Sequence, residues 1–168
     1  MRTLYLLSVW VHVISAIVWI GGSVFLALIL VPAMRQTEHR GVAASIVSWT
    51  GRRLRTIGWI CFGLFIVTGT YNLGFRGYTW GDLVDGSLFT GPFGETLAIK
   101  LAIFTLILIL SAVHDFYVGP KATELMRADP GSPQAHKLRR QASWFGRLNL
   151  LLALIVVFLG VMLVRGGF

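Results

Sequence analysis

The chain has 168 residues, of which 55% are hydrophobic and 13% are charged. In soluble domains about a quarter of the residues are charged, so this composition excludes an ordinary soluble domain and predicts an integral membrane protein. Lys and Arg outnumber Asp and Glu by 15 to 7, which gives a formal net charge of +8. Because the positive charges are concentrated in loops between apolar stretches, we expect a lipid bilayer as the partner and no nucleic acid.

Four apolar stretches are long enough to cross a hydrocarbon core, which takes about 20 helical residues. We therefore expect an all-α four-helix bundle that forms a single transmembrane domain over residues 1–168. The first stretch is too long for the apolar part of a secretory signal, which runs for about 7 to 15 residues, so we expect it to remain as a helix. The expected spans are about residues 4–31, 57–75, 93–118 and 148–164.

Basic residues separate the two sides of the membrane. The connection after the second span and the two chain ends carry only Arg2, Arg76 and Arg165. Because Lys and Arg favour cytoplasmic loops, the pattern predicts two out-in-out hairpins in a bacterial-type plasma membrane, with both termini outside. The other connections hold Arg35, Arg40, Arg52, Arg53 and Arg55 after the first span, and Lys121, Arg127, Lys137, Arg139, Arg140 and Arg147 after the third.

Two shared patterns in the hairpins indicate an internal repeat. The motif Ser-Trp-x-Gly-Arg precedes the second span of each hairpin, and a proline, Pro32 or Pro120, ends each first span. Counting back the same distance from each proline reaches His12 and Lys100. A repeat of parallel type would set these two side chains facing each other across the bundle. The alternative is that interfacial Trp and Arg anchors look alike in any membrane protein.

Polar residues at helical spacing are expected to face the interior, because polar groups are costly against lipid. Each candidate site residue also has a structural interpretation. His12 and Trp19 could serve only in helix packing. The side chain of Lys100 could extend to the membrane surface, and His114 could simply be solvated near the cytoplasmic edge. We expect an outer cluster of His12, Lys100, Thr68 and Asn72, and an inner cluster of His114, Asp115, Cys61 and Asn149.

The first span, HVISAIVWIGGSVFLALILVPAMR, resembles the opening helix of the copper-resistance protein D (CopD) membrane family, in which a histidine is followed by Trp-x-Gly-Gly and an apolar run to Pro and Arg. The resemblance continues through RRLRTIGW, TGTYNL, KLAIFTLILILSAVHDFYVGP and SWFGRLNLLLA, so it covers nearly the whole chain. It implies copper handling.

A second resemblance is to the HemJ-type protoporphyrinogen oxidases, small membrane proteins associated with haem b. The shared features are His12 with Trp19 seven residues later, and Lys100, Leu101 and His114 in the third span. This resemblance implies haem-dependent oxidation.

The supply of ligands favours haem b over copper. Copper(I) prefers sulfur ligands, whereas the chain offers one Cys, four Met and no Met-x-x-Met or Cys-x-x-Cys line. Haem needs only one or two axial ligands and an apolar slot between helices. We expect a haem b-binding protein that performs electron transfer or haem-dependent redox chemistry, with its electron partner unidentified. Phosphate-loop and Gly-x-Ser-x-Gly motifs are absent, so a membrane oxidoreductase is the enzyme class that stays open.

Two other functions stay open, namely copper import or tolerance with copper as the bound metal, and an accessory subunit of a larger membrane complex. A homodimer is a further expected assembly. His12 and His114 differ in depth by about 20 Å, so they cannot be the two axial ligands of one haem. The predicted cofactor-binding residues are His12, Lys100, Trp19, Asn72 and His114, and the predicted metal ligands are His12, Lys100 and His114.

Overall fold

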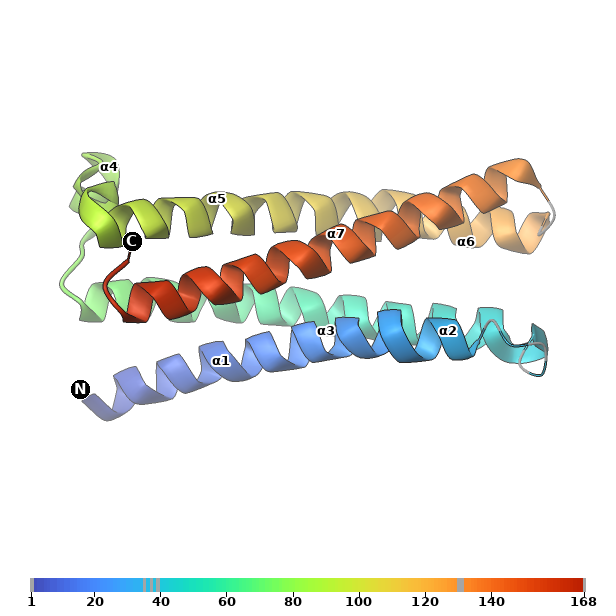
Figure 1. The fold of residues 1–168 in the computed structure, drawn as a ribbon, viewed down its shortest axis with the longest axis horizontal. Helices are drawn as coiled ribbons and strands as arrows, with labels where there is room; N and C mark the ends of the chain where they lie inside the picture. Colours follow the sequence, from blue (N-terminus) through green and yellow to red (C-terminus); the bar gives the residue numbers. More distant parts are fainter. Residues whose placement is uncertain (1, 35, 37, 39, 130–131, 168) are drawn as a thin grey trace.

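The computed structural model describes residues 2–34, 36, 38, 40–129 and 132–167, and Arg35 of the first basic loop lies outside them. Within the described residues the chain is helical and has no strand. Four of the described helices are long and apolar enough to cross a membrane. They lie side by side along one axis (Figure 1). The predicted all-α four-helix bundle is confirmed.

The first hairpin pairs two long helical rods. The first rod consists of α1 (Arg2–Val24), the π-helical segment η1 (Phe25–Leu30) and the short α2 (Val31–Ala33). The second rod is α3 (Arg40–Phe75), which packs along α1. The aromatic rings of Tyr5 and Phe75 stack where the two rods meet near the N-terminus, with centroids 4.2 Å apart.

The connection between the hairpins folds into α4 (Trp80–Val84) and a 3-10 turn, η3 (Ser87–Phe89). Thr79 caps α4, since its side chain accepts from the N–H of Asp82 while that carboxylate accepts from the N–H of Thr79. Leu88 is buried and anchors the connection on the bundle. It packs in an apolar cluster with Leu97 and Leu163, surrounded by Leu73, Tyr78, Phe89 and Phe93.

The second hairpin repeats the arrangement of the first. Its first rod consists of α5 (Gly91–Val113), the π-helical segment η4 (His114–Val118) and α6 (Gly119–Ala128). Its second rod is α7 (Pro133–Val164), which packs along α5 and α6. Proline stands in the first turn of both α5 and α7, where the missing N–H breaks no helical hydrogen bond.

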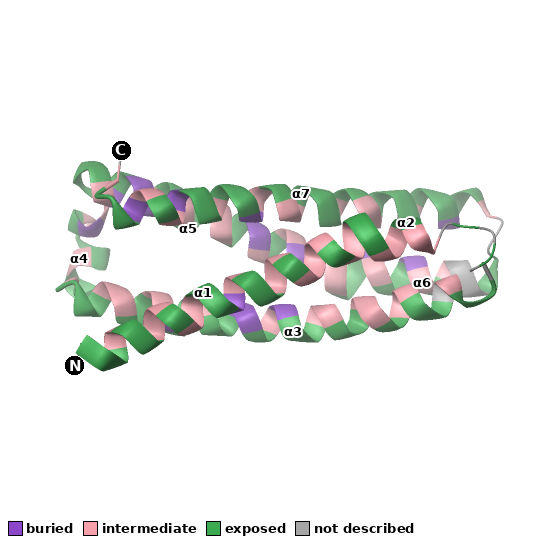
Figure 2. Cartoon of the chain, turned by 60° about the horizontal axis from the view of Figure 1, so that its bottom comes forward, coloured by how far each residue is buried: buried purple, intermediate pink, exposed green. Residues whose placement is uncertain are grey.

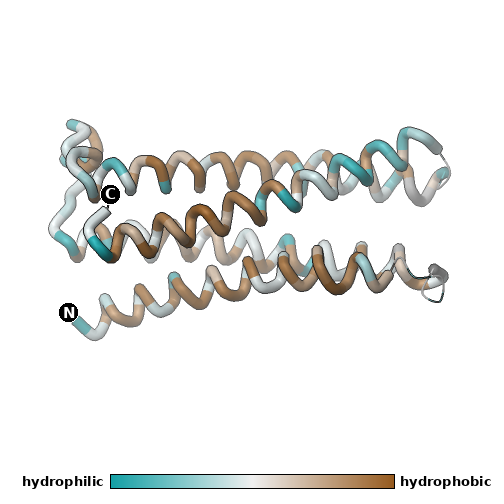
Figure 3. The backbone as a smooth tube through the Cα atoms, in the orientation of Figure 1, coloured by the Kyte–Doolittle hydropathy of each residue, from teal (hydrophilic) through white to brown (hydrophobic). Residues whose placement is uncertain are grey.

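The two ends of the bundle differ in the chain segments that they carry. Both termini and α4 lie at one end, which we call the terminal end (Figure 1). The ends of α2 and α6 and the starts of α3 and α7 lie at the other, which we call the basic end. Apolar residues dominate the length between the two ends (Figure 3). This arrangement agrees with two hairpins that start from the same side.

The second helix of each hairpin is longer than the predicted span. α3 begins at Arg40 and α7 at Pro133, whereas the spans were expected near residues 57 and 148. Hydropathy marks the part of a helix that lies in lipid, but the helix continues for as long as its backbone bonds do. The two Ser-Trp-x-Gly-Arg motifs therefore lie inside helices and not at their first turns.

The tryptophans of the two motifs are both exposed, and each lies beside an arginine, the motif arginine for Trp144 and the residue after it for Trp49. The side chains of Trp49 and Trp144 are 57% and 59% exposed. Each ring is covered by a guanidinium 5.8 Å from its centroid, that of Arg53 for Trp49 and that of Arg147 for Trp144. Exposed tryptophans beside cations are typical of the headgroup level of a membrane.

The π-helical segments give structural support to the internal repeat. η1 ends two residues before Pro32, and η4 ends two residues before Pro120. In both, the residue before the proline donates its N–H five residues back, to the carbonyl of Leu26 or His114. A proline ring has no N–H and clashes with the carbonyl four residues earlier, and a widened turn accommodates it.

The predicted inward faces are confirmed. Most of the surface is exposed, as expected for a bundle that meets lipid, and buried residues are confined to faces between helices (Figure 2). Polar residues buried on these faces are Ser15 on α1, Thr68 on α3, and Thr96 and Ser111 on α5.

Candidate functional site

His12 on α1 is held by Thr68 on α3. The Nδ1 atom of His12 lies 2.7 Å from Oγ1 of Thr68, whose hydroxyl donates to the carbonyl of Leu64 at 2.5 Å. A hydroxyl has one proton, so Thr68 must accept at His12, and Nδ1 of His12 must carry the hydrogen. In the neutral ring Nε2 then keeps its lone pair, and it has no hydrogen-bond partner within the described residues.

Lys100 on α5 shares this region. Its Nζ atom lies 3.7 Å from the place that a Cβ on Gly160 of α7 would take, so the glycine provides room for the amine. Lys100 lies within the range of an electrostatic interaction with His12. No acidic side chain of the described residues forms an ion pair with it. That His12 and Lys100 face each other across the bundle, as the repeat predicts, stays a prediction.

Asn72 lies one turn beyond Thr68 on the same face of α3. Its Oδ1 atom is buried and has no hydrogen-bond partner within the described residues. A buried carbonyl oxygen without a donor costs about 1 to 3 kcal/mol, so a donor or a cation is the natural neighbour of this atom. We call His12, Thr68, Asn72 and Lys100 the terminal-end cluster.

An aromatic layer lies next to His12 on the side of the basic end. The ring centroids of His12 and Phe65 are 5.1 Å apart. Phe65 packs 6.0 Å from Phe104, and Phe62 packs 4.9 Å from Trp19 and 6.1 Å from Phe104, with the planes tilted steeply in each pair. These rings, contributed by α1, α3 and α5, fill the interior beneath His12.

Trp19 has a packing role. The Cβ position of Gly58 lies 3.2 Å from the Trp19 ring, and that of Gly22 is filled by the end of Leu54. A Cβ on the neighbouring Gly21 would meet nothing within 4 Å, so the space beside Trp19 is closed at Gly22 and open at Gly21. An apolar groove of about 300 Å³ runs between α1 and α3, but His12 and Trp19 do not line it. The lining residues are Ile14, Ser15, Val18, Ile57, Ile60, Cys61 and Leu64.

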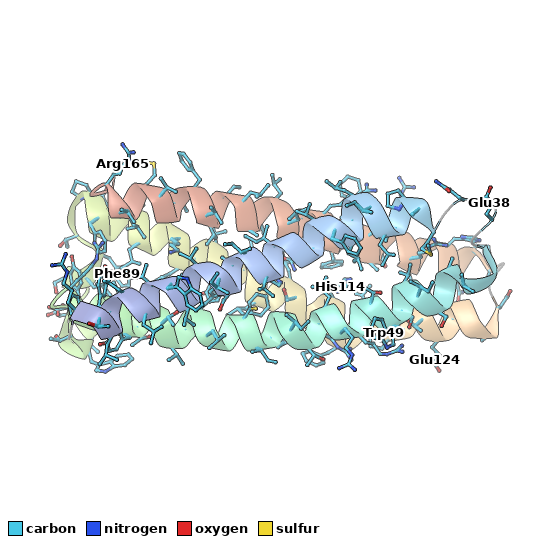
Figure 4. All side chains as sticks on the ribbon, turned by 90° about the horizontal axis from the view of Figure 1, so that it is seen from below. Glu38, Trp49, Phe89, His114, Glu124 and Arg165 are labelled. Atoms are coloured by element: carbon cyan, nitrogen blue, oxygen red, sulfur yellow. The ribbon has the colours of Figure 1, made fainter. Side chains whose placement is uncertain are left out.

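A second polar group surrounds Asp115 in η4. The Nδ1 atom of His114 lies 2.9 Å from Oδ1 of Asp115, and Nε1 of Trp59 donates to Oδ2 at 3.0 Å. Arg55 donates to the backbone carbonyl of Asp115 at 2.9 Å. Because a carboxylate accepts only, Nδ1 of His114 is the donor. In the neutral ring Nε2 then keeps its lone pair, and it has no hydrogen-bond partner among the described residues. Figure 4 places His114 between the middle of the bundle and the basic end.

Asn149 on α7 lies beside this group. Its Nδ2 atom donates to Oγ of Ser111 at 2.9 Å, while its Oδ1 atom is buried without a hydrogen-bond partner in the described part of the chain. We call Trp59, Ser111, His114, Asp115 and Asn149 the basic-end cluster.

The expected inner cluster was wrong about Cys61, which lines the groove beside Ser15. A helical face predicts which residues share a stripe, but not which neighbouring helix the stripe meets. Trp59 and Arg55 were missed as partners of Asp115. The available signal was that an indole N–H inside a bundle needs an acceptor, and Asp115 is an acidic residue within the apolar run of the third span.

The ligand supply for a metal is sparse. No group of three or more His, Cys, Asp or Glu side chains gathers within the described residues.

Comparison with known proteins gives three findings. The family model for copper resistance protein D matches residues 49–163, a stretch that contains every member of the two clusters except His12. An uncharacterized protein of Aquifex aeolicus (strain VF5) is 30% identical over 156 residues, which are 92% of this chain and 92% of that protein. The copper transport protein CutJ of Bacillus subtilis (strain 168) is 29% identical over 114 residues, which are 67% of this chain.

The chain spans only 19% of the length of CutJ, so most of that protein has no counterpart in the match. No solved structure matches the chain. None of these matches supports the resemblance to HemJ-type oxidases.

Proposed function

We propose that the chain, which belongs to the copper resistance protein D family by the match of the family model to residues 49–163, carries copper into or across the membrane. Copper was the alternative to haem b in our expectation from ligand supply. The family match favours copper, and the relative CutJ is described as a copper transport protein. No match favours haem b.

The observation that carries the proposal is the free Nε2 atom of His12. Imidazole nitrogen is a good ligand for copper, and ligating histidines usually donate their other N–H to a protein acceptor that fixes the ring. Thr68 is that acceptor here. The buried Oδ1 atom of Asn72 supplies an oxygen one turn away. In the proposal, His12 is the ligand that receives the copper ion and Asn72 assists it.

In the proposal, Lys100 lowers the affinity of this site for copper. A positive charge near His12 opposes a second cation, so copper is held less firmly than two neutral ligands alone would hold it. A transport site has to bind firmly enough to receive the ion and weakly enough to release it. In this role Lys100 tunes affinity and need not be a ligand.

We propose that the basic end faces the cytoplasm and the terminal end faces outside. The support is the distribution of Lys and Arg, which favours cytoplasmic placement of the basic connections. Copper received at the terminal-end cluster then moves inward. The direction corresponds to copper import or to tolerance through controlled entry.

Haem b fits the residues less well. His12 is a suitable axial ligand, but the interior beside it holds the rings of Phe65 and its neighbours. The groove between α1 and α3 is lined by other residues. We therefore assign no step of the function to haem.

Copper accumulation in cells tests the proposal. Cells expressing the chain and cells with an empty vector should differ in copper content, and His12→Ala should abolish at least 80% of that difference. His136→Ala is the matched control, because His136 is an exposed histidine of α7 outside both clusters, and it should keep the full difference. Equal copper accumulation by His12→Ala and the unchanged protein, at equal membrane abundance, would overturn the proposal.

A further inference from the structure

The two polar clusters follow one plan. In each, Nδ1 of a histidine is tied to an oxygen on the protein, Thr68 for His12 and Asp115 for His114, so Nε2 is free. In each, an asparagine presents a buried Oδ1 atom without a partner. Among the described residues these two amide oxygens are the only buried side-chain oxygen or nitrogen atoms without a hydrogen bond.

His114 and Asn149 lie on facing surfaces. Ser111 and His114 are three residues apart and share one face of the α5–η4 rod, while Phe145 and Asn149 share one face of α7. These faces meet twice, through the hydrogen bond between Asn149 and Ser111 at 2.9 Å and through the rings of His114 and Phe145 with centroids 6.4 Å apart. The free nitrogen and the free oxygen therefore belong to one small region between the two rods.

The chemistry of that region suits a cation. Nε2 of His114 and Oδ1 of Asn149 are both acceptors, and two acceptors cannot satisfy each other. The Asp115 carboxylate adds negative charge next to the ring. Arg55 is the positively charged residue that contacts Asp115. Its guanidinium donates a hydrogen bond to the backbone carbonyl of Asp115.

We propose that the basic-end cluster is a second copper-binding site, with Nε2 of His114 and Oδ1 of Asn149 as its ligands. The inference rests on the proposed function, because it takes the ion to be the copper received at His12. Along the bundle axis, His12 and His114 differ in depth by the length of about 13 helical residues, or about 20 Å. One ion therefore cannot contact both. The chain would hold two ions in separate sites, with the aromatic layer of Phe62, Phe65 and Phe104 between them.

Silver(I) binding to the purified protein in detergent tests the second site. Silver(I) has the charge of copper(I) and does not change oxidation state during dialysis. The unchanged protein should bind two silver ions per chain, and His12→Ala and His114→Ala should each bind one. The double variant should bind none, and His136→Ala should bind two.

The outcomes separate the two proposals. Two ions bound by His114→Ala, or a single ion bound by the unchanged protein and lost in His12→Ala, would overturn the second site and leave the proposed function intact. Two ions bound by His12→Ala would overturn the assignment of His12. Asn149→Leu leaves the hydrogen bonds of Asp115 in place and provides the same test if His114→Ala does not fold. It should weaken one of the two silver sites at least tenfold, and unchanged affinity at both sites would count against the second site.

Discussion

At the scale of single residues, one hydroxyl decides which nitrogen of His12 is free. The Thr68 hydroxyl gives its only proton to Leu64, so the ring must donate to it through Nδ1. Asp115 does the same for His114 with a carboxylate. Both clusters thus rely on a fixed histidine tautomer, which the residue types alone do not reveal.

Thr68→Val tests this dependence. Valine has nearly the shape of threonine but offers no oxygen, so Nδ1 of His12 loses its partner and the ring is free to rotate or to change tautomer. Loss of such a supporting hydrogen bond typically lowers metal affinity about 10- to 100-fold. Competition with a copper(I) chelator should show this loss at the terminal-end cluster. Thr68→Ser keeps the hydroxyl and should retain the affinity, and equal affinity of the two variants would contradict the argument.

Some contacts between side chains could be predicted from the sequence and others could not. The contact between His12 and Thr68 followed from helical faces and from depth, since both are polar residues of the outer half. The placement of Lys100 and Asn72 beside them stays a prediction. The bond between Trp59 and Asp115 did not follow, because the relative depth of two tilted helices is set by packing. Cys61 shared the predicted stripe on α3 but turned toward α1.

At the scale of elements, Asp115 connects the two hairpins. Its side chain and backbone accept from Trp59 and Arg55 of α3, while Asp115 itself belongs to η4 of the second hairpin. The π-helical turn of η4 follows from Pro120, and the corresponding turn of η1 from Pro32. The sequence shows the prolines, but the position of the π-helical turn that accommodates each of them depends on backbone geometry.

Trp59→Phe should weaken this connection. The substitution keeps an aromatic ring and removes the N–H that Asp115 accepts at 3.0 Å. A hydrogen bond to a charged group contributes about 1.5 to 3 kcal/mol, so the free energy of unfolding should fall by about that amount. Thermal unfolding in detergent would measure it as a Tm lowered by several degrees. Trp49→Phe is the control, because Trp49 is exposed and has no such bond, and an equal effect of both substitutions would contradict the assignment.

At the scale of the whole molecule, the hairpin architecture was predictable because four apolar stretches and two basic loops leave few arrangements. The extension of α3 and α7 beyond the apolar stretches was not, since hydropathy reports the surroundings of a helix and not its ends. The bundle carries both termini and α4 at one end (Figure 1). The direction of copper movement depends on which end faces the cytoplasm.

Cysteine labelling in intact cells tests the orientation. The natural Cys61 is buried, so background labelling should be low. Asp85→Cys, between α4 and η3, should react with a membrane-impermeant maleimide added outside. Ser132→Cys, at the start of α7, should react only after the cells are opened. The reverse pattern would place the basic end outside and reverse the proposed direction.

The central claim is that copper is bound by histidine nitrogen in a chain whose sulfur atoms take no part. X-ray absorption at the copper edge of the copper-loaded, detergent-purified protein tests it most directly. We expect nitrogen and oxygen neighbours with the scattering pattern of imidazole, and a loss of that copper signal when His12→Ala and His114→Ala are combined. A spectrum dominated by sulfur neighbours, or an imidazole pattern that the double variant leaves unchanged, would contradict the account.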